Sequence, residues 1–290
     1  MSGYVLGETH WPSGMTPSQR EILRAALSRL SQRQELTGLL APGSFAFGEM
    51  DEFSDLDLAL AVAPSVRADV LRSTPLFAQQ LGHRLVCFSG EHVGQPDLLI
   101  CLYGPPAVNV DLKVTTVDDL QADIERRVLL WERGSELRER CPGGAGRPRP
   151  VEWQWIEDRF WHWVHYTGTR IGRGELFEAA RILDVVRTRV LGPLALAEAG
   201  AHPHGVKKLE WLAPARALQM QRTVCGYDRE EVATAMHSAA TMYRSLRRGA
   251  PSELHVRSEA EAVATEYLAD IAARKGKRVP ERNALARRKP

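Results

Sequence analysis

The pattern of apolar positions divides the chain into a first half that favours strands and a second half that favours helices. In the first half, short apolar runs bounded by turn residues have the length of strands. Strands are predicted near 37–42, 55–62, 84–88, 97–103 and 108–115, and helices over 16–34 and 65–81. The segment 117–140 stays ambiguous, because its apolar run 128–131 fits either a strand or a helix.

Beyond residue 151, apolar residues recur at helical spacing. Helices are predicted over 152–171, 174–200, 206–222, 228–248 and 252–273. The segment between the halves is rich in Gly and Pro and has no apolar pattern, which is typical of a linker. The sequence therefore predicts an α+β protein. Its parts are a domain with a mixed sheet and helices over 1–141, a linker over 142–151, a helical bundle over 152–273 and a basic, disordered tail over 274–290.

The distribution of charge argues against a polynucleotide partner. The formal net charge is +2, but residues 1–150 have a balance of −4, residues 151–273 of −1 and residues 274–290 of +7. The predicted domains thus have no positive excess with which to attract DNA or RNA. A basic tail can bind nucleic acid, but a solvated chain end is the simpler interpretation. We therefore expect a small-molecule partner.

Cysteine spacing and hydropathy indicate a reducing compartment. Cys87, Cys101, Cys141 and Cys225 are scattered, so neither a zinc site nor a disulfide framework is predicted. No run approaches the ~20 consecutive apolar residues of a membrane helix. The first residues lack the basic region and apolar core of a secretory signal. A cytoplasmic protein without membrane association is expected.

Two acidic residues follow a glycine-serine turn at a spacing that suits metal-assisted phosphate chemistry. Gly43-Ser44 ends one predicted strand, and Asp55-Leu56-Asp57 leads the next. Residues two apart on a strand project to the same face, so Asp55 and Asp57 would point toward one site. Converging carboxylates repel each other unless a cation lies between them, and such hard oxygen ligands suit Mg²⁺ together with substrate phosphates. Gly43 would let the backbone approach a phosphate, and Ser44 adds a hydroxyl donor.

A third acid, Asp111, lies in the alternating run 108–115. Gly43-Ser44, the Asp55-Leu56-Asp57 strand and Asp111, in this order, resemble the signature of the nucleotidyltransferase superfamily related to DNA polymerase β. The resemblance implies that the three acids are catalytic and bind Mg²⁺, while Gly43 and Ser44 bind the triphosphate. Asp111 would either complete the metal site or take the proton from the attacking hydroxyl, and the sequence leaves both roles open.

The second half resembles the helical domain of antibiotic nucleotidyltransferases, particularly the lincosamide type. The resemblance covers 161–187, with its Arg173-Gly174-Glu175 turn, and the Lys-x-Leu-Glu segment at 207–210. It implies transfer of a nucleoside monophosphate, with ATP as the favoured donor, to a hydroxyl of a small molecule such as a lincosamide or an aminoglycoside. Lys207 is then a candidate for binding the triphosphate. Two alternatives stay open, namely a protein-modifying enzyme of toxin–antitoxin type and an inactive nucleotide-binding scaffold.

Other polar and aromatic residues have more than one interpretation. Trp161 lies off the apolar stripe of its predicted helix and is a candidate for lining a ligand cleft. Asp184 and Arg187, three apart on a predicted helix, are expected to form a local ion pair. The acids at 49, 51 and 52 either solvate the loop before Asp55 or favour a cationic acceptor.

Overall fold

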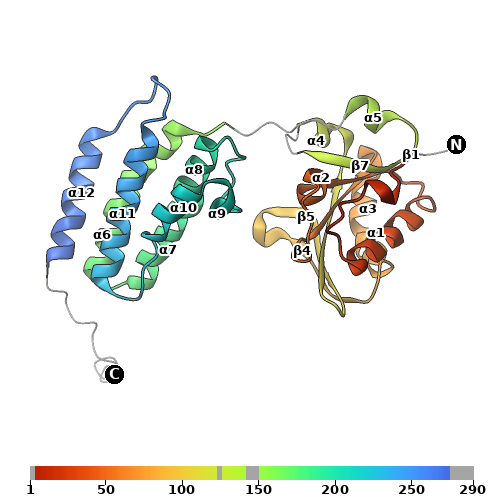
Figure 1. Cartoon of the computed structure of the whole chain (residues 1–290), viewed down its shortest axis with the longest axis horizontal. Helices are drawn as coiled ribbons and strands as arrows, with labels where there is room; N and C mark the ends of the chain where they lie inside the picture. The colour runs from red at the N-terminus through yellow and green to blue at the C-terminus, as the bar shows by residue number, and fades with distance from the viewer. Residues whose placement is uncertain (1–3, 123–125, 142–149, 275–290) are drawn as a thin grey trace, which may run out of the picture. The chain divides into compact units, whose positions relative to one another are not determined.

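The computed structural model describes residues 4–122, 126–141 and 150–274. The chain forms two compact units, Met1–Arg147 and Pro148–Pro290 (Figure 1). The first unit contains the sheet, whereas the described part of the second is helical, so the α+β prediction is confirmed. Most of the predicted linker and the basic tail beyond Arg274 lie outside the described residues. Within the described ranges, no helix has the length and apolar character that a membrane span requires.

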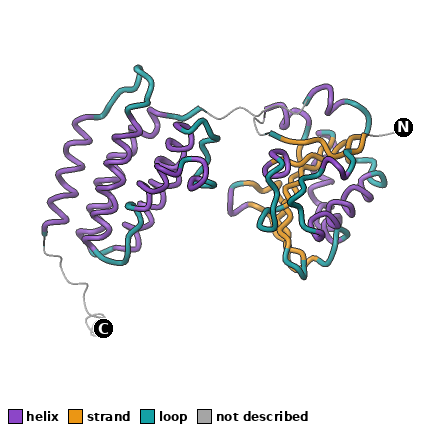
Figure 2. The backbone as a smooth tube through the Cα atoms, viewed as in Figure 1, coloured by secondary structure: helices purple, strands orange, loops and turns teal. Residues whose placement is uncertain are grey.

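A seven-stranded mixed sheet forms the centre of the first unit (Figure 2). Its strands, in spatial order, are β1 (Tyr4–Val5), β7 (Arg127–Glu132), β2 (Leu36–Pro42), β3 (Leu56–Val62), β6 (Val108–Thr115), β5 (Gln95–Tyr103) and β4 (Arg84–Gly90). Strands β3 and β6 pair in parallel, and the other neighbours pair antiparallel. The five predicted strands are all present, and the ambiguous run 128–131 belongs to β7.

Two helices cover one face of this sheet. Helix α1 (Pro17–Leu30) begins with a capping box between Thr16 and Gln19, and α3 is Arg67–Gln79. Apolar residues of both helices pack with the alternate residues Leu56, Leu58 and Leu60 of β3 in one core. These leucines are at most 1% exposed, and full burial of such a side chain contributes roughly 1.5–3 kcal/mol. The alternation in the sequence follows from this packing, because Leu56, Leu58 and Leu60 face the helices and the residues between them face the other side of the sheet.

The opposite face is covered over only part of its width. Three short helices follow strands in this unit. Phe45 of α2 (Gly43–Phe47) packs in the core with α1 and α3, whereas α4 (Val117–Ala122) and α5 (Glu136–Arg140) lie on the opposite face. A small cluster joins Leu40, Ala59 and Ala61 of the sheet to Val117 and Leu120 of α4 and Leu137 of α5. None of these helices was predicted, because elements of five or six residues are too short for a periodic pattern.

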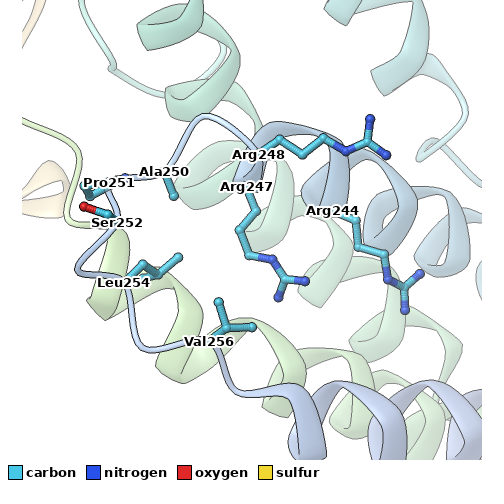
Figure 3. Close-up of a pocket in the computed structure, with 8 residues that line it drawn as sticks. All are labelled: Arg244, Arg247, Arg248, Ala250, Pro251, Ser252, Leu254 and Val256. Carbon is cyan, nitrogen blue, oxygen red and sulfur yellow. The ribbon is translucent and has the colours of Figure 1, made fainter.

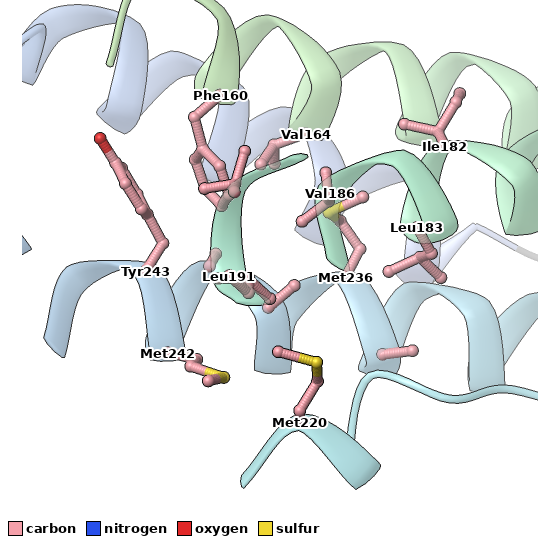
Figure 4. Packing of buried hydrophobic residues seen from close by; sticks show 14 of the residues in the cluster. Phe160, Val164, Ile182, Leu183, Val186, Leu191, Met220, Met236, Met242 and Tyr243 are labelled. Carbon is pink, nitrogen blue, oxygen red and sulfur yellow. The ribbon is translucent and has the colours of Figure 1, made fainter. Parts of the chain in front are cut away.

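The second unit is built from helices around one apolar core (Figure 4). Its elements are α6 (Trp153–Arg173), α7 (Leu176–Val186), a π-helical segment (Arg187–Leu191), α8 (Gly192–Glu198), α9 (Leu209–Leu212), α10 (Pro214–Gln221), α11 (Arg229–Arg247) and α12 (Ser258–Ala273). The predicted helix over 206–222 is interrupted. Pro214 begins α10 and holds Ala213 outside helical geometry, as expected for a residue that precedes proline.

Trp161 is a core residue, so the prediction that it lines a cleft is wrong. Its side chain is 1% exposed, and its indole Nε1 donates to Glu157 Oε1 at 3.2 Å. Helix α6 buries a broader face than one stripe because it packs against α7, α11 and α12. Trp163, which lies on the predicted stripe, is only partly buried.

Candidate active site

The glycine-serine turn lies directly against a carboxylate of the next strand. Gly43 follows β2 and adopts a left-handed conformation with φ of +63°. A Cβ atom at this position would lie 2.9 Å from Oδ2 of Asp57. Glycine suits this conformation, and a Cβ atom at position 43 would displace the Asp57 carboxylate. The fold thus places Gly43, the first residue of the glycine-serine turn, beside Asp57.

Two of the three predicted acids lie side by side in the sheet. Asp57 of β3 and Asp111 of β6 are partners in the parallel register. Partners in neighbouring strands project to the same face, and strands are about 4.8 Å apart. Asp55 is exposed and lies just before β3, two residues from Asp57. The sheet thus fixes the positions of Asp57 and Asp111, while Asp55 enters from the preceding loop.

Asn109 is a site residue that the sequence reasoning missed. Its Nδ2 donates to Oδ1 of Asp111 at 3.0 Å, and both side chains are half-buried. The two residues are two apart on β6 and therefore share a face. The hydrogen bond orients the Asp111 carboxylate. The rule that residues two apart on a strand share a face linked Asp55 with Asp57, and it would likewise have linked Asn109 with Asp111.

The loop before Asp55 is held by its own polar groups. Oδ1 of Asp51 accepts from the Phe53 backbone N–H at 3.0 Å and from the Ser54 hydroxyl at 2.7 Å. The buried Gln19 of α1 donates to the Ser54 carbonyl at 2.8 Å. Asp51 therefore shapes the loop that delivers Asp55 to the site, which is a structural role. Gln19 was not predicted, because nothing in the local pattern links α1 to this loop.

The donor set fits a magnesium ion that also binds substrate. Within the residues that the structure describes, no three His, Cys, Asp or Glu side chains are grouped so that they could hold a metal ion by themselves. Magnesium usually takes only one or two protein carboxylates and completes its shell with waters and phosphate oxygens. Asp57 and Asp111, placed as neighbours by the sheet, supply that number of hard oxygen ligands.

The candidate residues of the second unit are less informative. Lys207 is exposed in the turn before α9, and its role in binding a triphosphate stays a prediction. Arg187 lies 3.6 Å from Asp184, which confirms the predicted local ion pair.

A pocket of about 430 Å³ in the second unit is lined by three arginines and the loop after α11 (Figure 3). Arg244 and Arg247 bind Glu261 at 2.6 and 2.7 Å, and Arg247 also binds Glu157 at 3.0 Å. Because these guanidinium groups neutralise carboxylates of their own unit, they act as structural ion pairs.

A matched pair of glycine variants tests the close contact at the turn. Gly43→Ala should lower any activity of the site by roughly tenfold to a hundredfold, the scale of a misplaced catalytic group. The added Cβ would push against Asp57, whereas Gly48→Ala, at φ +70° with no atom within 4 Å, adds only backbone strain. Activity and melting temperature of both variants would be compared. Equal losses in the two variants would contradict a special role for the Gly43–Asp57 contact.

Two solved structures align with most of the chain. The crystal structure of an aminoglycoside 6-adenyltransferase from Bacillus subtilis is 13% identical, with a TM-score of 0.41 over 90% of this chain and 100% of that chain. A nucleotidyltransferase-like protein from Exiguobacterium sibiricum 255-15 is 11% identical, with a TM-score of 0.36 over 86% of this chain and 78% of that chain. No family model matches the chain, and no curated protein matches it either. Both TM-scores are below 0.5, so these similarities carry no inference about activity or substrate.

Proposed function

We propose that the protein is a Mg²⁺-dependent nucleotidyltransferase. It would move a nucleoside monophosphate, with ATP as the favoured donor, onto a hydroxyl of a small molecule, for example a lincosamide or aminoglycoside antibiotic. One observation carries the proposal: the left-handed Gly43 packs against the carboxylate of Asp57, which is in register with Asp111 on the neighbouring strand. A phosphate-binding turn and paired carboxylates are the parts that this chemistry requires.

Each part of the site has a distinct role in this proposal. The Gly43-Ser44 backbone and the Ser44 hydroxyl bind the β- and γ-phosphates of the donor. Asp57 and Asp111 are the residues that would hold Mg²⁺, with Asp55 of the preceding loop as a third proposed ligand, and the bound ion would neutralise phosphate charge. Asn109 holds Oδ1 of Asp111, so this carboxylate is oriented either as a metal ligand or as the base for the attacking hydroxyl. Lys207 is proposed as a further phosphate contact.

In the proposed reaction, the α-phosphate goes to the acceptor and the β- and γ-phosphates leave together, so radioactive label can follow each group. The acceptor oxygen forms a bond to the α-phosphorus, the bond from that phosphorus to the bridging oxygen breaks, and pyrophosphate leaves with the electron pair. The hydroxyl proton passes to the base. Label at the α-position should therefore appear on the acceptor, and label at the γ-position should appear in pyrophosphate.

The test is transfer from α-³²P-labelled ATP, GTP, CTP and UTP to lincomycin and kanamycin, with and without EDTA. The expected result is a labelled small molecule that does not form when EDTA removes Mg²⁺. Label on a protein band would favour the protein-modifying alternative. Transfer of label from γ-³²P-ATP to the small molecule would reject nucleotidyl transfer. A protein that neither transfers label nor gains thermal stability from Mg²⁺ and a triphosphate would reject the proposal.

A further inference from the structure

An apolar surface continues from the two carboxylates across the sheet. In register, Asp57 lies beside Asp111, Asp111 beside Ile100 of β5, and Ile100 beside Phe88 of β4. Register partners project to the same face, so these four side chains form one row. With strands about 4.8 Å apart, Ile100 is roughly 5 Å and Phe88 roughly 10 Å from the Asp111 backbone along this row.

The neighbouring rows extend the same surface. One row contains Asn109, Leu102 and Val86, and the other contains Ala59, Lys113 and Leu98. Val86 is 47% and Phe88 44% exposed, and Leu98, Ile100 and Leu102 are half-buried. We call Val86, Phe88, Leu98, Ile100 and Leu102 the apolar platform. The other face of the same strands is covered, since Cys101 and Tyr103 are buried in the core with α1 and α3.

The strand order indicates on which side of the α-phosphate the apolar platform lies. The Gly43-Ser44 turn follows β2, the carboxylates lie on β3 and β6, and the platform lies on β5 and β4. Under the proposed function, the leaving pyrophosphate is held at the turn. In-line displacement places the nucleophile on the side of the α-phosphate away from the leaving group. The attacking hydroxyl therefore approaches from the β6–β5 side, next to the platform.

We infer that the acceptor is a hydroxylated molecule with an apolar, ring-bearing body that lies over Ile100 and Phe88 while its hydroxyl reaches the Asp57–Asp111 pair. The inference rests on the proposed function and narrows its acceptor class. Apart from the two carboxylates, the charged side chain in these three rows is Lys113, which is exposed. A polycation would compete with Mg²⁺ for the carboxylates, would meet a like charge at Lys113 and would leave the platform uncovered, because its ammonium groups do not cover apolar side chains. An amphipathic acceptor covers the apolar residues and is selected over a polycation.

The test compares the two acceptor types in wild-type protein and in Phe88→Ser. Lincomycin and a panel of apolar-bodied alcohols represent the first type, and kanamycin represents the second. Nucleotidyl transfer should favour the apolar-bodied acceptors. Phe88→Ser should lower their kcat/KM about tenfold through KM, because it removes apolar contact made equally in the ground and transition states. Leu76→Ser is the matched control, since Leu76 is 62% exposed on α3, on the helix-covered side of the sheet.

Four results would overturn the inference. Kanamycin could be the better acceptor, or no apolar-bodied compound could be labelled although the protein binds Mg²⁺ and ATP. Phe88→Ser could have the same kinetics as Leu76→Ser, or it could change only the sedimentation coefficient, which would make the platform an interface between copies. In these cases the proposed function stands if ATP binding and transfer persist. Loss of both in the wild-type protein would reject the function, and the inference with it.

Discussion

Asp57→Asn should reduce nucleotidyl transfer about a thousandfold without unfolding the protein. Asp57 lies next to both Gly43 and Asp111, so its carboxylate is at the centre of the proposed site. Loss of one group that stabilises developing charge costs about 10²–10³-fold in rate, and loss of a metal ligand also weakens Mg²⁺ binding. Label transfer at saturating ATP and a Mg²⁺ titration would measure the two effects separately.

Stability separates a catalytic role for Asp57 from a structural one. Asparagine has nearly the same shape, and the substitution removes one of two facing negative charges. The fold should therefore be kept, and the melting temperature without Mg²⁺ should stay close to that of the wild-type protein. Asp69→Asn is the control, because Asp69 is an exposed residue of α3 in the same unit. A large fall in melting temperature for Asp57→Asn, or activity near that of Asp69→Asn, would contradict the assigned role.

Glu157→Ala should destabilise the second unit by about 3–5 kcal/mol, the cost of breaking a buried ion pair by removing one partner. Glu157 is 0% exposed. Its Oε1 accepts from Trp161 Nε1 at 3.2 Å, Arg247 Nη1 at 3.0 Å and the Arg257 backbone N–H at 2.9 Å, and its Oε2 accepts from the Tyr243 hydroxyl. Burial, together with this hydrogen bond, raises the pKa of Tyr243, so the tyrosine stays a donor. Alanine would leave these donors without their acceptor.

Urea unfolding followed by tryptophan fluorescence measures this effect, because Trp161 is in direct contact with Glu157. Glu178→Ala is the matched control, since Glu178 makes a surface ion pair with Arg181 on α7, and such pairs contribute little. We expect the transition of the control to coincide with that of the wild type. A Glu157→Ala transition that also coincides would show that the buried network does not stabilise the unit.

Local patterns predicted the elements that carry the site. The alternation of Leu56, Leu58 and Leu60 identified β3 because these residues face the helices, and the same period placed Asp55 and Asp57 together. The turn chemistry of Gly43 was also local, since its φ of +63° suits glycine. Short helices escaped prediction, because α2, α4 and α5 are too brief to show a period.

Contacts between distant segments were decided by the tertiary structure. Only the parallel register of β3 with β6 shows that Asp111 is the neighbour of Asp57, and that Ile100 and Phe88 continue the row. Trp161 changed from a cleft candidate to a core residue because α11 supplies Tyr243 and Arg247 around it. The sequence by itself determined which residues alternate, turn and carry charge, because these properties depend on near neighbours. The strand register and the packing partners depend on which segments meet in the fold, and near neighbours do not specify that.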